Sequence, residues 1–144
     1  MPPTPVPSDV DAFLLRPNPA VVASVRPDGS PHTAATWYEW AGGRALLNMD
    51  ANRLRLRFMR RDPRVALTCL DVDNWYRQVT LLGEVVELRP DEDLADIDRL
   101  SLRYVGRQYH NRVRPRVTAL VRVDAWYGWD PYRAALWQDG SAAG

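Results

Sequence analysis

The chain has 144 residues, 26% of them charged, and its formal net charge is +1. This length suffices for one domain with a sizeable core but not for two. The near-neutral charge gives no field that would attract nucleic acid or an acidic membrane surface, so we expect neither as a partner. No apolar run could span a bilayer and no signal peptide is evident, so a soluble, cytoplasmic protein is expected.

The first third of the chain predicts a short helix followed by an antiparallel meander. We assign residues 1–16 to an N-terminal strap and a short helix. Turns rich in glycine, proline and aspartate then separate apolar runs that are typical of strands. The expected strands are Ala20–Arg26, Pro31–Trp40 and Arg44–Met49.

The arginine-rich stretch at residues 50–63 fits two periodicities. As a strand, its first half would alternate arginine with apolar residues, whereas in a helix Leu54 and Phe58 share one face. We predict a helix, because Asp50 or Asn52 can cap its start, arginines suit its end, and an Asp-Pro pair stops it.

The second half of the chain predicts more strands and a longer helix. Gly83 lies near the middle of a long strand and predicts a bulge there, while Asp91 can cap the helix. The expected elements are strands Arg64–Leu70, Trp75–Leu88 and Arg116–Asp124 and a helix from Pro90 to Gly106. Six antiparallel strands with short helices make a small barrel over residues 17–130, followed by an aromatic C-terminal tail at 131–144.

Few side chains in this sequence can carry out chemistry unaided. The histidines are His32, expected at the surface, and His110, and no hydrolase, Rossmann or phosphate-loop motif occurs. Cys69 lies in an apolar run, where a buried thiol is expected. Two distant histidines do not make a ligand set, so we expect no metal site.

The remaining features favour an enzyme that depends on a bound cofactor. Arg53 and Arg55 lie in the first turn of the predicted helix, beside free backbone N–H groups, where a phosphate is well bound. The alternative is a solvated basic face. Trp37, Trp75 and Tyr76 offer flat surfaces for an aromatic ring, although a tryptophan in a strand also suits a core.

Several motifs in collinear order give the chain a family resemblance. They are Arg26–His32 (RPDGSPH), Thr36–Tyr38 (TWY), Arg53–Arg57 (RLRLR), Arg61–Val65 (RDPRV), Asp73–Arg77 (DNWYR) and Trp126–Trp129 (WYGW). Together they resemble the split-barrel flavin/deazaflavin oxidoreductases, the small relatives of pyridoxamine-phosphate oxidase, many of which use coenzyme F420.

The resemblance implies a six-stranded split β-barrel, of the FMN-binding split-barrel type, that works as a homodimer with the cofactor in a groove between subunits. Arg53 and Arg55 would hold the cofactor phosphate, and Tyr76 and Arg77 would polarise the substrate as catalytic residues. Trp75, Tyr76 and Arg77 would close the site from the other subunit. The full set of cofactor-binding residues implied is Thr33, Ala34, Ala35, Thr36, Trp37, Asn48, Met49, Arg53, Leu54, Arg55, Trp75, Tyr76 and Arg77.

Two positions depart from the family pattern. Arg55 stands where relatives usually have lysine, which keeps the charge but adds a planar fork. Phe58 stands where they usually have asparagine, which removes a hydrogen-bonding group and bears on the choice between a deazaflavin and FMN.

The resulting prediction is an F420-dependent reductase. It would transfer a hydride to an electron-poor C=C bond, or a similar acceptor, of a small, polycyclic metabolite, in the setting of secondary-metabolite biosynthesis. The alternatives are an FMN-dependent oxidase or reductase on the same fold, or a non-catalytic split barrel that binds flavin or heme.

Overall fold

The computed structural model describes residues 6–130 and 135–138. Three helices and eight strands make up this part of the chain. The helices are α1 (Ser8–Leu15), α2 (Leu54–Arg61) and α3 (Ala95–Val105). The strands are β1 (Ala20–Val25), β2 (Pro31–Thr36), β3 (Glu39–Ala41), β4 (Arg44–Asp50), β5 (Arg64–Leu70), β6 (Gln78–Pro90), β7 (Arg116–Asp130) and β8 (Ala135–Gln138).

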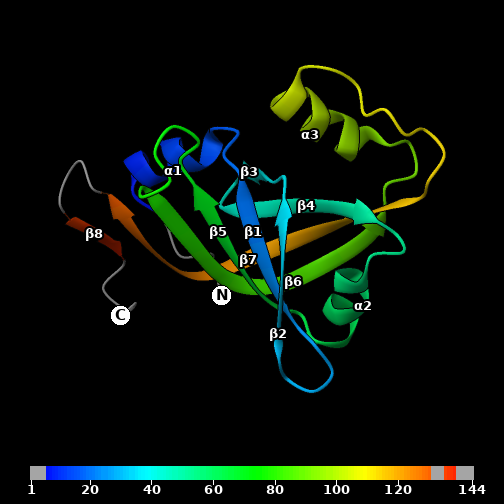
Figure 1. Ribbon diagram of the computed structural model, residues 1–144, viewed down its shortest axis with the longest axis horizontal. Helices are drawn as coiled ribbons and strands as arrows, with labels where there is room; N and C mark the ends of the chain where they lie inside the picture. Colours follow the sequence, from blue (N-terminus) through cyan, green and yellow to red (C-terminus); the bar gives the residue numbers. More distant parts are fainter. Residues whose placement is uncertain (1–5, 131–134, 139–144) are drawn as a thin grey trace.

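All the strands belong to one antiparallel sheet, strongly curled, in the order β2-β1-β5-β6-β7-β4-β3, with β8 paired to β7 (Figure 1). The mainly β, antiparallel prediction is therefore confirmed, but the number of strands, six, is wrong. The ladder is also not closed into a barrel: among the described residues, β2 and β3 end the sheet at its two edges and do not pair.

The sheet stays open because the predicted strand Pro31–Trp40 is interrupted. β2 ends at Thr36, and Trp37 and Tyr38 link it to β3 at the opposite edge of the sheet. Tyr38 is fully buried, and its hydroxyl donates a hydrogen bond to the carbonyl oxygen of Leu14, 2.9 Å away. The buried ring fixes the chain in this crossing, which a strand period alone does not reveal.

The last two predicted strands have different bounds in the structure. β6 begins at Gln78 rather than at Trp75, because residues 71–77 form a closed turn in which the Asp71 amide donates to the Arg77 carbonyl oxygen. β7 runs on to Asp130, far beyond the expected end at Asp124. Of the predicted tail, residues 131–134 and 139–144 lie outside the described residues, and 135–138 form β8.

The arginine-rich stretch is a helix, as predicted, but its cap is different. α2 begins after Arg53 and no side chain caps it. Asp50 instead accepts a hydrogen bond from the Asn52 amide at 2.9 Å and pairs with Arg114 at 3.3 Å. The helix ends at Arg61 before Asp62, whose backbone is extended ahead of Pro63, as expected for a residue before proline.

The core lies inside the curl of the sheet and continues under α1. Phe13 and Leu14 of α1 are buried in it, and Trp40 of β3 donates from its indole nitrogen to Asp11 at 2.8 Å. Cys69 is buried there, as predicted, and burial raises the pKa of its thiol to about 12. No helix in the described part of the chain is both long and apolar enough to cross a membrane.

The helix expected from Pro90 begins at Ala95, because Pro90 is still paired with Val117 in the sheet. Asp91 caps it across the intervening turn: its carboxylate accepts from the amides of Asp96 at 3.1 Å and Ile97 at 2.9 Å. α3 is thereby held above β4 (Figure 1).

Gly83 marks a shift in the register of β6 against β7, as the sequence predicted. A Cβ atom there would overlap the backbone carbonyl oxygen of Arg122. We expect Gly83→Ala to lower the free energy of unfolding by about 3 kcal/mol, the upper end for overpacking. Gly42→Ala is the control, since Gly42 has φ +59° but open space around it, and should cost only about 1 kcal/mol. Urea unfolding midpoints measure the stability of both variants. An equal loss of stability in the two would contradict the close approach of Gly83 to the Arg122 backbone.

Candidate functional site

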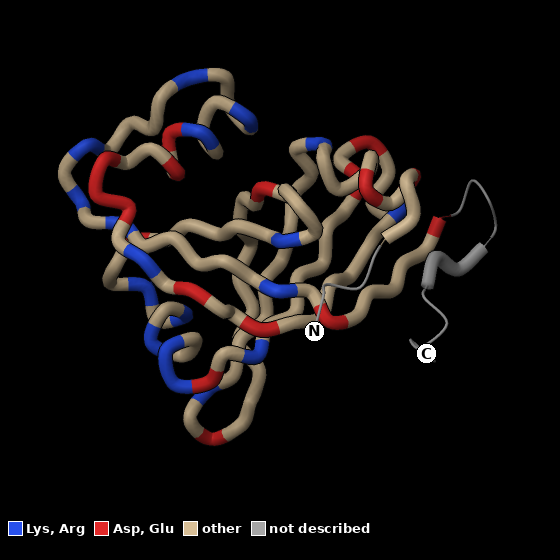
Figure 2. Tube along the Cα trace, turned by 180° about the vertical axis from the view of Figure 1, so that it is seen from behind, with Lys and Arg blue, Asp and Glu red and all other residues tan. Residues whose placement is uncertain are grey.

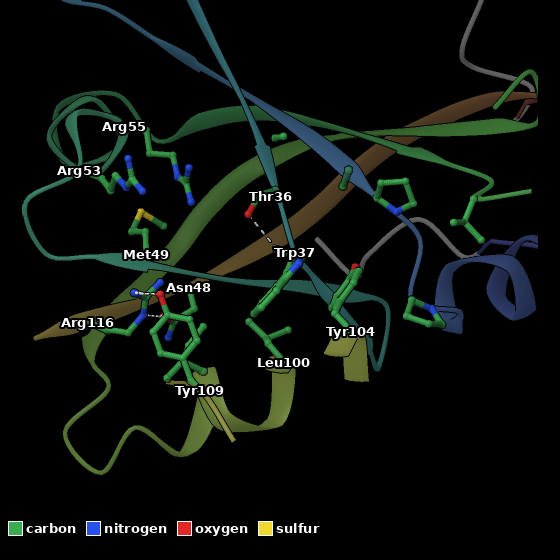
Figure 3. Close-up of a pocket in the computed structure, with 16 residues that line it drawn as sticks. Thr36, Trp37, Asn48, Met49, Arg53, Arg55, Leu100, Tyr104, Tyr109 and Arg116 are labelled. Carbon is green, nitrogen blue, oxygen red and sulfur yellow. Dashed lines mark hydrogen bonds between the residues drawn. The ribbon is translucent and has the colours of Figure 1, made fainter. Parts of the chain in front are cut away.

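The open seam of the sheet contains a cavity of about 590 Å³. It lies between β2 on one side and β4 on the other, with α3 and the N-terminus of α2 completing its walls (Figure 3). The lining residues are Pro17, Pro19, Ala20, Ala35, Thr36, Trp37, Asn48, Met49, Arg53, Arg55, Val72, Ile97, Leu100, Tyr104, Tyr109 and Arg116.

The backbone of β4 contributes to this cavity because its edge is only partly paired. β3 pairs with β4 no further than Leu46. From Leu47 to Asp50, that edge of β4 has no strand partner among the described residues, whereas its other edge is paired with β7 throughout. Unpaired N–H and C=O groups next to Asn48 and Met49 are therefore available for a ligand.

One end of the cavity is strongly cationic. Arg53 and Arg55 enter it from the start of α2, and Arg116 enters it from the start of β7 (Figure 3). Within the described residues no carboxylate lies at ion-pair distance from any of these arginines. Figure 2 shows how basic residues gather along the α2 segment.

Arg55 is the most constrained of these cations. Its Nε is buried and has no hydrogen-bond partner within the described part of the chain. Burial, together with the charges of Arg53 and Arg116, lowers the pKa of the Arg55 guanidinium. A bound anion would relieve both the desolvation and the repulsion, so this end of the cavity suits a phosphate or carboxylate.

The other end of the cavity is aromatic and apolar. The ring of Trp37 stacks on Tyr104 of α3, with centroids 5.3 Å apart and planes inclined by only 7°. Tyr109 meets Trp37 edge-on at 6.4 Å. The Tyr104 hydroxyl donates to the carbonyl oxygen of Asn18 at 2.7 Å, and this hydrogen bond holds the Tyr104 ring in place. Such a wall suits a planar conjugated ring.

Asn48 belongs to a buried polar network below the cavity. Its amide nitrogen donates to Asp91 at 3.1 Å and to Thr118 at 3.0 Å, and its oxygen accepts from Nε of Arg116 at 2.7 Å. Thr118 in turn donates to Asp96 at 2.7 Å. These partners allow only one orientation of the amide, because carboxylates accept and a guanidinium donates. The Asn48 side chain therefore orients Arg116 rather than facing the cavity unpaired.

The cavity brings together about half of the residues that the sequence pointed to. Ala35, Thr36, Trp37, Asn48, Met49, Arg53 and Arg55 line it. The predicted residues that do not line it are Thr33, Ala34, Leu54, Trp75, Tyr76 and Arg77.

Trp75, Tyr76 and Arg77 lie in the turn before β6. Trp75 and Tyr76 stack on each other at 4.7 Å and are 63% and 59% exposed. Arg77 points the other way: it lies 3.6 Å from Asp71 and 3.7 Å from Asp130, with its guanidinium over the ring of Phe13. Arg77 therefore joins the turn to α1 and β7, and its predicted catalytic role remains a prediction.

Phe58 and His32 form a small cluster of their own. Phe58 is buried on α2. The centroid of its ring lies 5.3 Å from that of the His32 ring and 5.5 Å from the Arg26 guanidinium. Neither Phe58 nor His32 lines the cavity. His32 is half-buried by this contact rather than at the surface as predicted. The departure from the family pattern at Phe58 therefore takes no hydrogen-bonding group out of this cavity.

The sequence did not point to Tyr104, Tyr109 or Arg116 as site residues. Tyr104 lies within the helix predicted from Pro90 to Gly106, and Tyr109 lies between that helix and the strand predicted from Arg116. Arg116 opens β7, and it faces the site only because β7 pairs with β4 in a register that sets Arg116 opposite Asp50. The only local signal is the run of arginines at Arg112, Arg114 and Arg116.

A curled antiparallel sheet, open along one seam, is the arrangement of a split-barrel protein, and its cavity, with a cationic end and an aromatic end, suits an anionic, ring-containing ligand. The model of the pyridoxamine 5'-phosphate oxidase family matches residues 6–130, so the chain belongs to that family. The resemblance seen in the sequence is thereby confirmed. Among curated proteins, no sequence matches the chain.

Solved structures extend this comparison. An F420 reductase is 32% identical, with a TM-score of 0.78, over 84% of this chain and 98% of that one. A conserved hypothetical protein from Mycobacterium tuberculosis is 23% identical, with a TM-score of 0.68, over 99% and 94% of the two chains. A heme-binding protein from Mycobacterium smegmatis is 16% identical, with a TM-score of 0.58, over 88% of this chain and 55% of that one. The first of these supports an oxidoreductase function, and the other two share the fold.

The buried network gives a direct test. Asn48→Asp would set a carboxylate against that of Asp91 and remove both amide donors, so we expect a loss of unfolding free energy on the order of 3 kcal/mol at neutral pH. The loss should shrink as the pH falls, since a protonated carboxyl can donate again. Asn111→Asp is the matched control, because the Asn111 oxygen only accepts from the amides of Val113 and Arg114, both at 3.0 Å. Equal urea midpoints for the two variants would contradict the network.

Proposed function

We propose that this protein is an F420-dependent reductase that acts on an electron-poor C=C bond, or a similar acceptor, of a small, conjugated, polycyclic metabolite. The observation that carries the proposal is the cationic end of the cavity, where Arg55 is partly buried beside Arg53 and Arg116 without a carboxylate in the described residues. The similarity to an F420 reductase over nearly all of that chain supports the same function.

The cavity fits a cofactor that has an anionic side chain and a planar ring. Arg53 and Arg55 would hold the phosphate of the side chain, and the buried Nε of Arg55 would gain the acceptor it lacks. Trp37 and the unpaired edge of β4 at Asn48 and Met49 would bound the ring. When bound, a reduced deazaflavin supplies a hydride, and FMN on the same fold supplies related redox chemistry.

The contribution of the protein would be positioning and exclusion of water. The rigid pair of Trp37 and Tyr104 would set the plane of the ring and of an acceptor beside it. Leu100 and Ile97 of α3 would cover the site with apolar surface, which strengthens the electrostatic contacts inside it.

The proposal includes a homodimer in which Trp75, Tyr76 and Arg77 of each subunit complete the site of the other. In support, the stacked pair of Trp75 and Tyr76 is largely exposed in the single chain, and exposed aromatic pairs are typical of interfaces.

The phosphate assignment is tested by binding. We expect Arg53→Ala/Arg55→Ala to weaken F420 binding by on the order of 100-fold or more, because two charge-assisted contacts are lost. Quenching of deazaflavin fluorescence measures the affinity, with FMN titrated in parallel. F420 should bind the unaltered protein more tightly than FMN does.

The matched control is Arg57→Ala/Arg60→Ala, which removes the same charge from exposed positions of α2 that do not line the cavity. This control should bind F420 like the unaltered protein. Equal weakening of F420 binding in both double variants would mean that overall positive charge, and not a phosphate site, explains the affinity. If the purified protein carries bound FMN, FMN is the cofactor and the F420 assignment is wrong.

The dimer is tested by mass in solution. Trp75→Ala/Tyr76→Ala should shift the protein from dimer to monomer in sedimentation velocity and should weaken F420 binding in step, since each site would lose its partner's residues. The matched control is Leu102→Ala, an exposed apolar residue on α3 that does not line the cavity. A monomeric unaltered protein that binds F420 would overturn this part of the proposal.

A further inference from the structure

The cavity contains a second polar pair, formed by Tyr109 and Arg116, that the phosphate site does not use. Nη1 of Arg116 donates to the Tyr109 hydroxyl at 3.2 Å, and the guanidinium lies 4.7 Å from the centroid of the Tyr109 ring. Both residues line the cavity, and Figure 3 shows them side by side next to Asn48, where the cationic end meets the aromatic end.

Each member of the pair keeps a donor that is not committed. The Tyr109 oxygen accepts from Arg116, so its own proton is left to donate, and it has no acceptor within the described residues. Arg116 uses Nε for Asn48 and Nη1 for Tyr109, which leaves Nη2 without a partner in the same part of the chain. Nη2 is accessible to solvent, and Arg116 lines the cavity.

The pair is also held rigidly. The oxygen of Asn48 fixes Arg116, and the amide of Asn48 is itself fixed by Asp91 and Thr118. The backbone amide of Tyr109 donates to Asp98 of α3 at 3.1 Å. Donors held in place before the ligand arrives are the arrangement that stabilises an oxygen on which negative charge develops.

We propose that Tyr109 and Arg116 bind the carbonyl oxygen of a conjugated enone or quinone-type substrate, with Tyr109 as the proton donor. This inference rests on the proposed function. When bound, a reduced deazaflavin would supply a hydride, with both electrons, to the substrate's β-carbon, and the C=C electron pair would then form an enolate. The enolate oxygen takes the Tyr109 hydroxyl proton, and the resulting enol becomes the ketone. The Tyr109 oxygen, stabilised by Arg116, regains a proton from water.

A binding measurement without cofactor tests the subsite, using 4-nitrophenol as a stand-in for the enolate. Its phenolate absorbs visible light, so a lowered apparent pKa of the bound probe is seen directly. We expect Arg116→Gln to weaken phenolate binding about tenfold or more, and Tyr109→Phe to weaken it less, because the charged donor contributes more. Arg57→Ala/Arg60→Ala, which removes two charges from exposed positions outside the cavity, should leave phenolate binding unchanged.

Turnover supplies the second measurement, with reduced F420 and cyclohex-2-enone. Tyr109→Phe should lower kcat on the order of 100-fold, as for loss of a general acid, while the F420 affinity stays unchanged. The matched controls are Tyr127→Phe on the outer face of β7 and Arg107→Gln after α3, both exposed. Arg116→Lys serves if Arg116→Gln does not fold, and should recover part of the phenolate binding.

The outcomes separate this inference from the proposed function. Unchanged kcat in Tyr109→Phe, or phenolate binding that survives Arg116→Gln, would overturn it. Loss of F420 affinity in these variants to the extent seen in Arg53→Ala/Arg55→Ala would assign the pair to the cofactor instead. If the unaltered protein binds no F420 but still lowers the pKa of 4-nitrophenol through Arg116, the cofactor proposal fails and the oxygen subsite stands.

Discussion

A guanidinium partly withdrawn from water without a counter-ion carries a desolvation cost, and Arg55 is in that position. The fold holds it there because Leu56, Phe58 and Met59 of α2 are buried, which turns the start of the helix toward the seam of the sheet. The described residues offer no carboxylate to offset the charge. The rest of the site is arranged around this cation, from the adjacent Arg53 to the opposite Arg116.

The seam itself depends on where backbone pairing stops. Tyr38 is buried between β2 and β3, so the chain leaves one edge of the sheet and joins the other instead of continuing as one strand. β3 is short, and beyond Leu46 the edge of β4 is left unpaired. A closed ladder would have filled this space with paired backbone. The open one leaves room for a ligand between two rigid edges.

The polar network under the cavity links the lining of the cavity to α3. Asp91 caps α3 and accepts from Asn48, and Asn48 fixes Arg116. The helix that covers the cavity and the cation that lines it are thus oriented by the same buried amide. Such a network is sensitive to any change in donors and acceptors, because each buried group has a specific partner.

The sequence by itself determined the antiparallel, mainly β class, the helical state of the arginine-rich stretch, the bulge at Gly83 and the family, because these follow from local periodicity, turn chemistry and collinear motifs. It also pointed to Arg53 and Arg55, which line the cavity, because their spacing at the start of one helix is a local property. Only the tertiary structure decided that the sheet stays open and that Tyr109 and Arg116 join the cavity. Those residues are far from α2 in the chain, and they reach the site through the register of β7 on β4 and the hydrogen bonds of Asn48, which no local pattern specifies.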